Sequence, residues 1–193
     1  MIFKIFAIVE MAAFYACYFT KMLAQKKKGI QTDQMGKGKE GFVKFIEVTL
    51  KLVTCLTPIV ELISIFLFKP LLPEVARWIG ALLGVAGVSI FIISVVTMRD
   101  SWRAGVSENE KTELVTEGIY QISRNPAFVG FDLLYIGILL MFFNWLLFAI
   151  SAFAMVMFHL QIVNVEEDFL IVTFGADYIN YKNKVCRYLG RKR

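Results

Sequence analysis

The chain has 193 residues, of which 58% are hydrophobic, 15% aromatic and 19% charged. This apolar content is well above that of soluble domains, so it argues against a soluble globular enzyme and predicts one compact membrane domain. The net charge of +5 comes from Lys and Arg gathered in a few stretches, which indicates membrane orientation and no nucleic-acid partner. The three cysteines, Cys17, Cys55 and Cys186, lack metal-ligand spacing, so we expect neither a disulfide framework nor a bound metal.

Four apolar stretches predict five membrane-spanning helices. They cover Met1–Thr20, Leu52–Phe68, Trp78–Met98 and Pro126–Val163, and the last is long enough for two spans. Phe143-Asn144-Trp145 interrupts it like a tight turn, which predicts a helical hairpin. No small-residue cleavage site follows the first stretch, so we interpret it as a retained helix.

A pair of small residues in the third stretch predicts close helix packing. Gly80 and Gly84 form a GxxxG pair with Gly87 nearby, a spacing that lets a second membrane helix approach closely.

The fold class that follows is all-α: an integral membrane bundle of about five spans with a C-terminal cytosolic or interfacial helix. We expect a single domain over residues 1–193. Its parts are three spans in 1–98, a cytosolic loop in 99–125, the hairpin in 126–163 and a cytosolic C-terminal segment in 164–193.

Basic residues gather on alternate connections, which predicts the orientation. The cytosolic side would hold Lys21, Lys26, Lys27, Lys28, Lys37, Lys39, Arg99, Arg103, Lys111, Arg124, Lys182, Lys184, Arg187, Arg191, Lys192 and Arg193. The other side has chiefly Lys4, Lys69 and Arg77. The positive-inside rule then places the N-terminus outside and the C-terminus in the cytosol.

The first loop contains a misleading motif. Residues 36–41 spell G-x-G-x-x-G, but a dinucleotide site requires a strand before that motif and a helix after it. Here a lysine run precedes it, so we predict a mobile cytosolic loop.

The third connection combines glycine, aromatic and ionisable residues at a membrane edge, where ionisable groups usually mark a functional site. Its order is Leu114-Val115-Thr116-x-Gly118-Ile119-Tyr120, then Arg124-Asn125-Pro126-x-Phe128-x-Gly130. The paired carboxylates Glu166 and Glu167 follow downstream, before a run that contains Phe174, Gly175, Tyr178, Tyr181, Val185 and Arg187.

This order resembles the signature of isoprenylcysteine carboxyl methyltransferases and related phospholipid methyltransferases, over roughly the second half of the chain. Ser101-Trp102-Arg103-x-Gly105 also resembles the segment that precedes the motif in bacterial members. Two positions depart from the pattern: Asn125 replaces a His found in many members, and Phe128 replaces a Tyr. Asn hydrogen-bonds but does not titrate near neutrality.

The resemblance implies S-adenosylmethionine as the methyl donor, and a lipid-borne or prenylated small molecule or protein as the acceptor. It implies carboxyl O-methylation at the membrane–cytosol interface. The implied cofactor-binding residues are Leu114, Val115, Gly118, Tyr120, Arg124, Asn125, Pro126, Phe128, Gly130, His159, Glu166 and Glu167. Arg124, Asn125 and Arg187 are the catalytic candidates, and Trp102, Arg103 and Asp132 the substrate candidates, with Arg187 or Arg103 orienting an acceptor carboxylate.

Several alternatives stay open at this point. One of Glu166 and Glu167 would accept hydrogen bonds from the cofactor while the other pairs with a cation such as Arg124. His159 lies on one helical face with Glu166 but is also explained as a helix-packing residue. For the whole chain, an NADPH-dependent membrane reductase of the sterol reductase type and a non-catalytic lipid-binding protein are the competing hypotheses.

Overall fold

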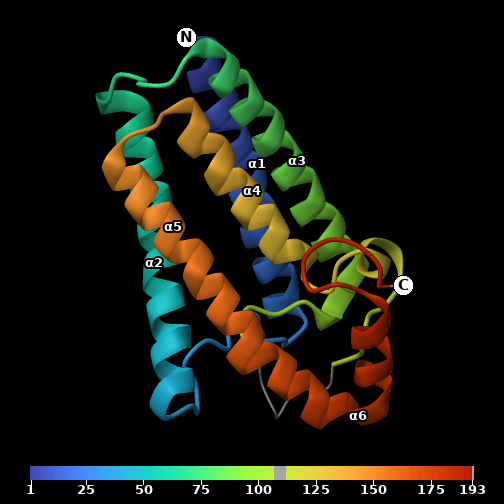
Figure 1. The fold of residues 1–193 in the computed structure, drawn as a ribbon. Coiled ribbons are helices and arrows are strands. Elements are labelled where there is room, and N and C mark those ends of the chain that lie inside the picture. Colours follow the sequence, from blue (N-terminus) through green and yellow to red (C-terminus); the bar gives the residue numbers. More distant parts are fainter. Residues whose placement is uncertain (107–111, 193) are drawn as a thin grey trace.

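The computed structural model describes residues 1–106 and 112–192, so Lys111 and Arg193, counted above in the charge bias, lie outside the described residues. These residues form a bundle of helices (Figure 1). The main helices are α1 (Ile2–Lys27), α2 (Gly41–Leu67), α3 (Glu74–Met98), α4 (Pro126–Met141), α5 (Trp145–Gln161) and α6 (Glu167–Lys184). Short 3₁₀ turns occupy Arg99–Ser101 and Gly118–Gln121, and a π turn occupies Ile162–Glu166. The expectation of an all-α bundle is confirmed.

The helices have the length and composition of membrane spans. Among the described residues, four helical stretches are long and apolar enough to cross a bilayer: Ile2–Lys27, Gly41–Leu67, Glu74–Ser101 and Trp145–Lys184. The shorter apolar helix α4 completes the predicted hairpin with α5. Large apolar side chains such as Leu82 and Trp145 are more than two-thirds exposed on the bundle surface, as expected where lipid replaces water. The chain is an integral membrane protein.

Glycines bring α3 and α4 together. A Cβ atom on Gly87 would lie 2.7 Å from the carbonyl oxygen of Gly130, and one on Gly137 would lie 2.7 Å from that of Gly80. The two backbones therefore touch, and the close packing predicted from the GxxxG pair is confirmed. It also gives Gly130 a packing role at the helix interface.

The first loop is anchored rather than free. Ala104 donates its N–H to the carbonyl of Thr32 at 2.9 Å, and Gln34 donates to the carbonyl of Ala104 at the same distance. The buried amide of Gln25 donates to the Trp102 carbonyl at 2.8 Å. These hydrogen bonds tie Gln25, Thr32 and Gln34 to the third connection, which the sequence places far away. The mobility predicted for residues 36–41 stays a prediction.

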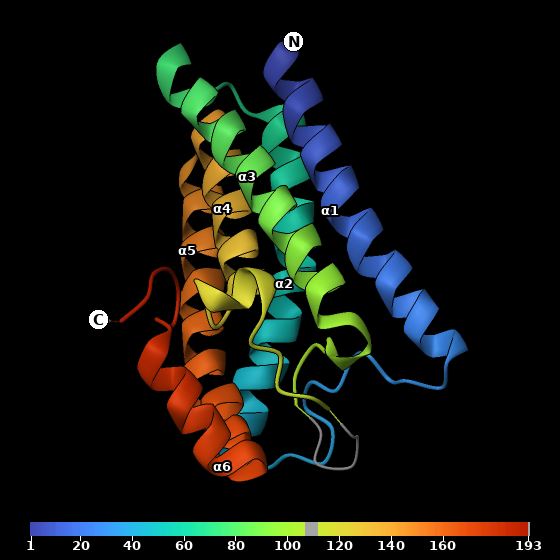
Figure 2. The same cartoon turned by 90° about the vertical axis from the view of Figure 1, so that its right-hand side faces the viewer.

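The C-terminal segment folds back against the third connection. Gly175 has φ 51° and ψ −122°, which only glycine adopts readily, and it bends α6. Beyond α6, Gly190 donates to the carbonyl of Ile122 at 2.8 Å. Both views show α6 and the C-terminus gathered at one end of the bundle, beside the yellow segment around residue 120 (Figures 1 and 2).

Candidate functional site

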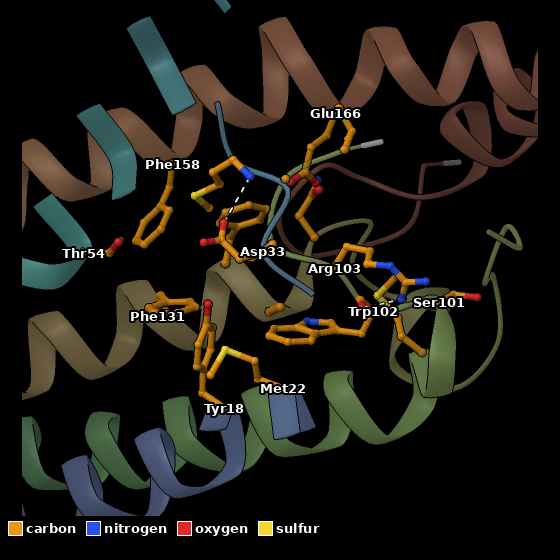
Figure 3. Close-up of a pocket in the computed structure, with 18 of the residues that line it drawn as sticks. Tyr18, Met22, Asp33, Thr54, Ser101, Trp102, Arg103, Phe131, Phe158 and Glu166 are labelled. Carbon is orange, nitrogen blue, oxygen red and sulfur yellow. Dashed lines mark hydrogen bonds between the residues drawn. The ribbon is translucent and has the colours of Figure 1, made fainter. Parts of the chain in front are cut away.

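A cavity of about 840 Å³ lies where the third connection and α6 meet the membrane helices. Its polar end is lined by Arg124, Asn125 and Glu166, and its other end runs between the apolar faces of α1 and α2. In Figure 3, Glu166 reaches in from the orange-brown α5–α6 side, opposite Tyr18 and Trp102. The cavity therefore joins a charged membrane edge to an apolar interior.

The charged end is organised by Glu167, which is only 4% exposed. Its carboxylate contacts Arg124 Nη1 at 3.0 Å, Lys182 Nζ at 2.8 Å and Arg187 Nε at 2.7 Å. The hydrogen bond with Glu167 raises the pKa of the Arg187 guanidinium above its usual value, so that cation stays charged. A carboxylate this buried requires such partners, which makes Glu167 a structural anchor.

Arg124 is aimed at the cavity by its neighbours. Its Nη1 donates to the hydroxyl of Tyr178 at 2.7 Å, and its backbone N–H donates to the carbonyl of Cys186 at 3.1 Å. Arg124 lines the cavity, yet within the described part of the chain its buried Nε has no hydrogen-bond partner. A buried guanidinium donor without a partner indicates a place for an anionic or polar ligand group.

The neighbouring residues are held by main-chain contacts. The Asn125 amide donates to the carbonyl of Arg187 at 3.0 Å, and the Tyr181 hydroxyl donates to the carbonyl of Tyr120 at 2.6 Å. Burial raises the pKa of the Tyr120 hydroxyl well above its usual range. Tyr178 and Tyr181 pack in one cluster with Leu114 and its neighbours, and both tyrosines also line the cavity.

The structure separates the two glutamates. Glu166 lines the cavity, whereas Glu167 faces the three cations. His159 does not share the cavity with Glu166: it is exposed, and its Nδ1 lies 2.7 Å from the Tyr188 hydroxyl. The shared helical face predicted for His159 and Glu166 fails because the π turn at Ile162–Glu166 rotates everything downstream of α5.

The candidate residues divide into two groups. The cavity is lined by Trp102, Arg103, Leu114, Val115, Tyr120, Arg124, Asn125, Phe128 and Glu166. The lining does not include Gly118, Pro126, Gly130, Asp132, His159, Glu167 and Arg187. Members of the second group support the first: Pro126 opens α4, Gly118 takes a positive φ of 58° beside Thr97, and Arg187 holds Glu167 and Asn125.

Sequence reasoning missed the contribution of the first half of the chain. The cavity is also lined by Met11, Tyr15, Tyr18, Met22, Asp33, Lys51, Thr54, Cys55 and Pro58. The sequence signal for these residues was weak, because a helix that is apolar on all sides does not reveal which face meets a cavity and which meets lipid. Asp33 and Lys51, charged residues flanking the second span, were the detectable exception.

Comparison with known proteins gives a family match for part of the chain. Residues 75–177, more than half of the chain, match the phospholipid methyltransferase family. The chain belongs to this family. The match begins in α3 and ends within α6, so it contains the 118–130 motif and both glutamates but neither α1 nor α2.

Curated relatives match the same half. The protein-S-isoprenylcysteine O-methyltransferase of Saccharomyces cerevisiae is 36% identical over 109 residues, which are 55% of this chain and 46% of that protein. The enzyme of that name from Dictyostelium discoideum is 30% identical over 110 residues, 56% of this chain and 46% of its own length. Arabidopsis thaliana protein-S-isoprenylcysteine O-methyltransferase B is 35% identical over 82 residues, 42% of this chain and 41% of its own. The match therefore spans less than half the length of each of these relatives.

Proposed function

We propose that the protein is an S-adenosylmethionine-dependent methyltransferase that acts at the membrane–cytosol interface on the carboxylate of a prenylated acceptor. One observation carries this proposal: a single cavity connects the charged end at Arg124 and Glu166 with an apolar slot between α1 and α2. Such a cavity allows a water-soluble methyl donor and a lipid-borne acceptor to meet away from bulk water. The relatives' names supply the acceptor class.

The charged end fits the amino-acid part of the methyl donor. The unpartnered Nε of Arg124 is suited to a carboxylate, and Glu166 is suited to an ammonium or to ribose hydroxyls. Leu114, Val115 and Tyr181 offer apolar surface for the adenine base. When bound there, S-adenosylmethionine would supply a methyl group on a positively charged sulfur for transfer to a carboxylate oxygen, with the electron pair of the broken carbon–sulfur bond staying on sulfur.

The protein's part in that reaction is alignment and exclusion of water. A carboxylate nucleophile requires no general base, which agrees with Asn125 in place of a titrating histidine. Arg103 lines the cavity, but Arg187 is absent from its lining and is engaged by Glu167. Of the two arginines considered for orienting an acceptor carboxylate, we therefore retain Arg103.

The reductase alternative fits the charges less well. NADPH carries several phosphate charges and needs several cations in its site. Lys182 and Arg187 bind Glu167 and do not line the cavity. The basic residues that do line it are Lys51, Arg103 and Arg124, and of these Lys51 is paired with Asp33 and Arg124 with Glu167.

The two cofactors can be separated by thermal unfolding. We expect S-adenosylhomocysteine to raise the melting temperature of the detergent-purified protein. At a ligand concentration of 100 times its Kd, binding should add about 2.7 kcal/mol to the free energy of unfolding. NADPH should leave the melting temperature unchanged. Stabilisation by NADPH alone would support the reductase, and stabilisation by neither would support a non-catalytic protein.

The orientation proposed with this function is an outside N-terminus and a cytosolic C-terminus, supported by the lysine and arginine distribution. Single cysteines at Lys27 and Lys192, in a background where Cys17, Cys55 and Cys186 are replaced by serine, should react with an impermeant thiol reagent only after cells are opened. Labelling of Lys27→Cys in intact cells would contradict the five-span arrangement.

A further inference from the structure

One face of α2 lines the cavity from its cytosolic end to the membrane interior. The residues on this face are Lys51, Thr54, Cys55, Pro58 and Leu62, at helical spacing. The eleven steps from Lys51 to Leu62 rise roughly 16 Å at about 1.5 Å each. That length is about half of the ~30 Å hydrocarbon core. The face is charged at its cytosolic end because it begins with Lys51, and it is apolar at membrane depth because it ends with Leu62.

The facing stripe on α1 completes the slot. Its residues are Ile8, Met11, Ala12, Tyr15, Tyr18, Phe19 and Met22. Figure 2 shows α1 diverging from the other helices toward its C-terminal end. A slot with a charged mouth and an apolar depth matches a single-chain amphiphile with an anionic head and a hydrocarbon tail. Both stripes lie outside the residues that match the family.

Two opposite charges line the mouth of the slot. Lys51 Nζ forms an ion pair with Asp33, and both residues line the cavity. Asp33 is held by the first loop, where it accepts a hydrogen bond from the Met35 N–H at 3.2 Å. In Figure 3 it lies in the middle of the labelled residues, between Thr54 and Trp102. The Lys51 side chain remains 46% exposed, so it can reach another anion.

We propose that Lys51 is a specificity-determining residue that binds the carboxylate of the prenylated acceptor, with Asp33 as the internal anion that competes for it. This inference rests on the proposed function for the identity of the acceptor. The acceptor tail then lies between α1 and α2, and its carboxylate faces the charged end of the cavity. An incoming anion must displace Asp33 from Lys51 before it can bind there. This requirement favours acceptors whose tail also fills the slot, because the tail supplies additional binding energy.

The proposal predicts effects of opposite sign for the two members of the pair. Lys51→Gln should weaken equilibrium binding of an S-prenylated N-acetylcysteine by about 10-fold, the loss of one charge-assisted hydrogen bond. Asp33→Asn should strengthen that binding, because it removes both the competitor and a repulsive charge. Lys51→Arg should restore most of the affinity. Lys44→Gln, the same charge change at an exposed site of α2 outside the cavity lining, is the control.

Binding is measured without turnover, by calorimetry in micelles, with the carboxamide of the same prenylcysteine as a second ligand. The carboxamide should bind the wild type and Lys51→Gln equally. If Lys51→Gln and Asp33→Asn weaken binding of both ligands alike, the pair only fastens the first loop to α2 and the inference is overturned. Lys51-dependent carboxylate binding without any methyl transfer would overturn the proposed function and leave the inference standing.

Discussion

Arg124→Ala is expected to lower the affinity for S-adenosylhomocysteine by about 100-fold, the loss of charge-assisted hydrogen bonds worth about 2–3 kcal/mol. The fold should survive, because Glu167 keeps Lys182 and Arg187 as partners. Calorimetric titration gives the affinity, and helicity and melting temperature serve as folding controls. Arg124→Lys should recover only part of the affinity, since lysine lacks the planar fork of donors.

The two glutamates provide the matched comparison for this result. Glu166→Gln should weaken cofactor binding with little change in melting, because Glu166 lines the cavity. Glu167→Gln should mainly lower stability, because it leaves three cations without their shared carboxylate. The double variant with Arg124→Ala and Glu167→Gln should lose less free energy of unfolding than the sum of the losses in the two single variants. Additive effects, or unchanged affinity in every folded variant, would show that these residues only stabilise helix ends.

Gly137→Ala should produce the largest loss of stability. Its Cβ would lie 2.7 Å from the Gly80 carbonyl oxygen and 2.9 Å from the Gly84 Cα, and backbone atoms cannot move aside as a flexible side chain can. We expect the free energy of unfolding in micelles to fall by about 3 kcal/mol, the upper end for overpacking. The measurement is chemical unfolding followed by circular dichroism.

The control for Gly137→Ala is Val85→Leu, which enlarges a side chain of α3 that is 47% exposed on the bundle surface. It should leave stability unchanged to within about 0.5 kcal/mol. Equal stability of Gly137→Ala and the wild type would contradict the close contact of α3 and α4.

The bundle was predictable because bilayer thickness fixes span length and because glycine spacing marks a helix contact. The hairpin turn was also predictable: Asn144 caps α5 by accepting from the Leu147 N–H at 3.0 Å. Helix ends were less predictable from hydropathy, since α1 continues to Lys27, where polar residues leave no hydropathy signal. Helical periodicity placed His159 on the same face as Glu166, which is wrong, because the sequence gives no sign of the π turn between them.

The sequence predicted the candidate site only for the residues of the 114–130 motif and for the glutamate pair downstream of it. Arg124 and the glutamate pair were expected together, but their division of roles depends on contacts with Tyr178, Lys182 and Arg187 that only the fold brings about. The walls from α1 and α2, including Asp33 and Lys51, required the structure, because tertiary packing alone decides which side of an apolar helix faces a cavity.

The most direct test of the proposed activity supplies purified protein in micelles with methyl-labelled S-adenosylmethionine and an S-prenylated N-acetylcysteine. The proposal predicts a labelled methyl ester, which mild base releases as volatile labelled methanol, and no such product from the carboxamide. Label that stays in the lipid product after base would indicate methylation of nitrogen or sulfur instead. Absence of transfer from a protein that binds both ligands would contradict the proposed activity.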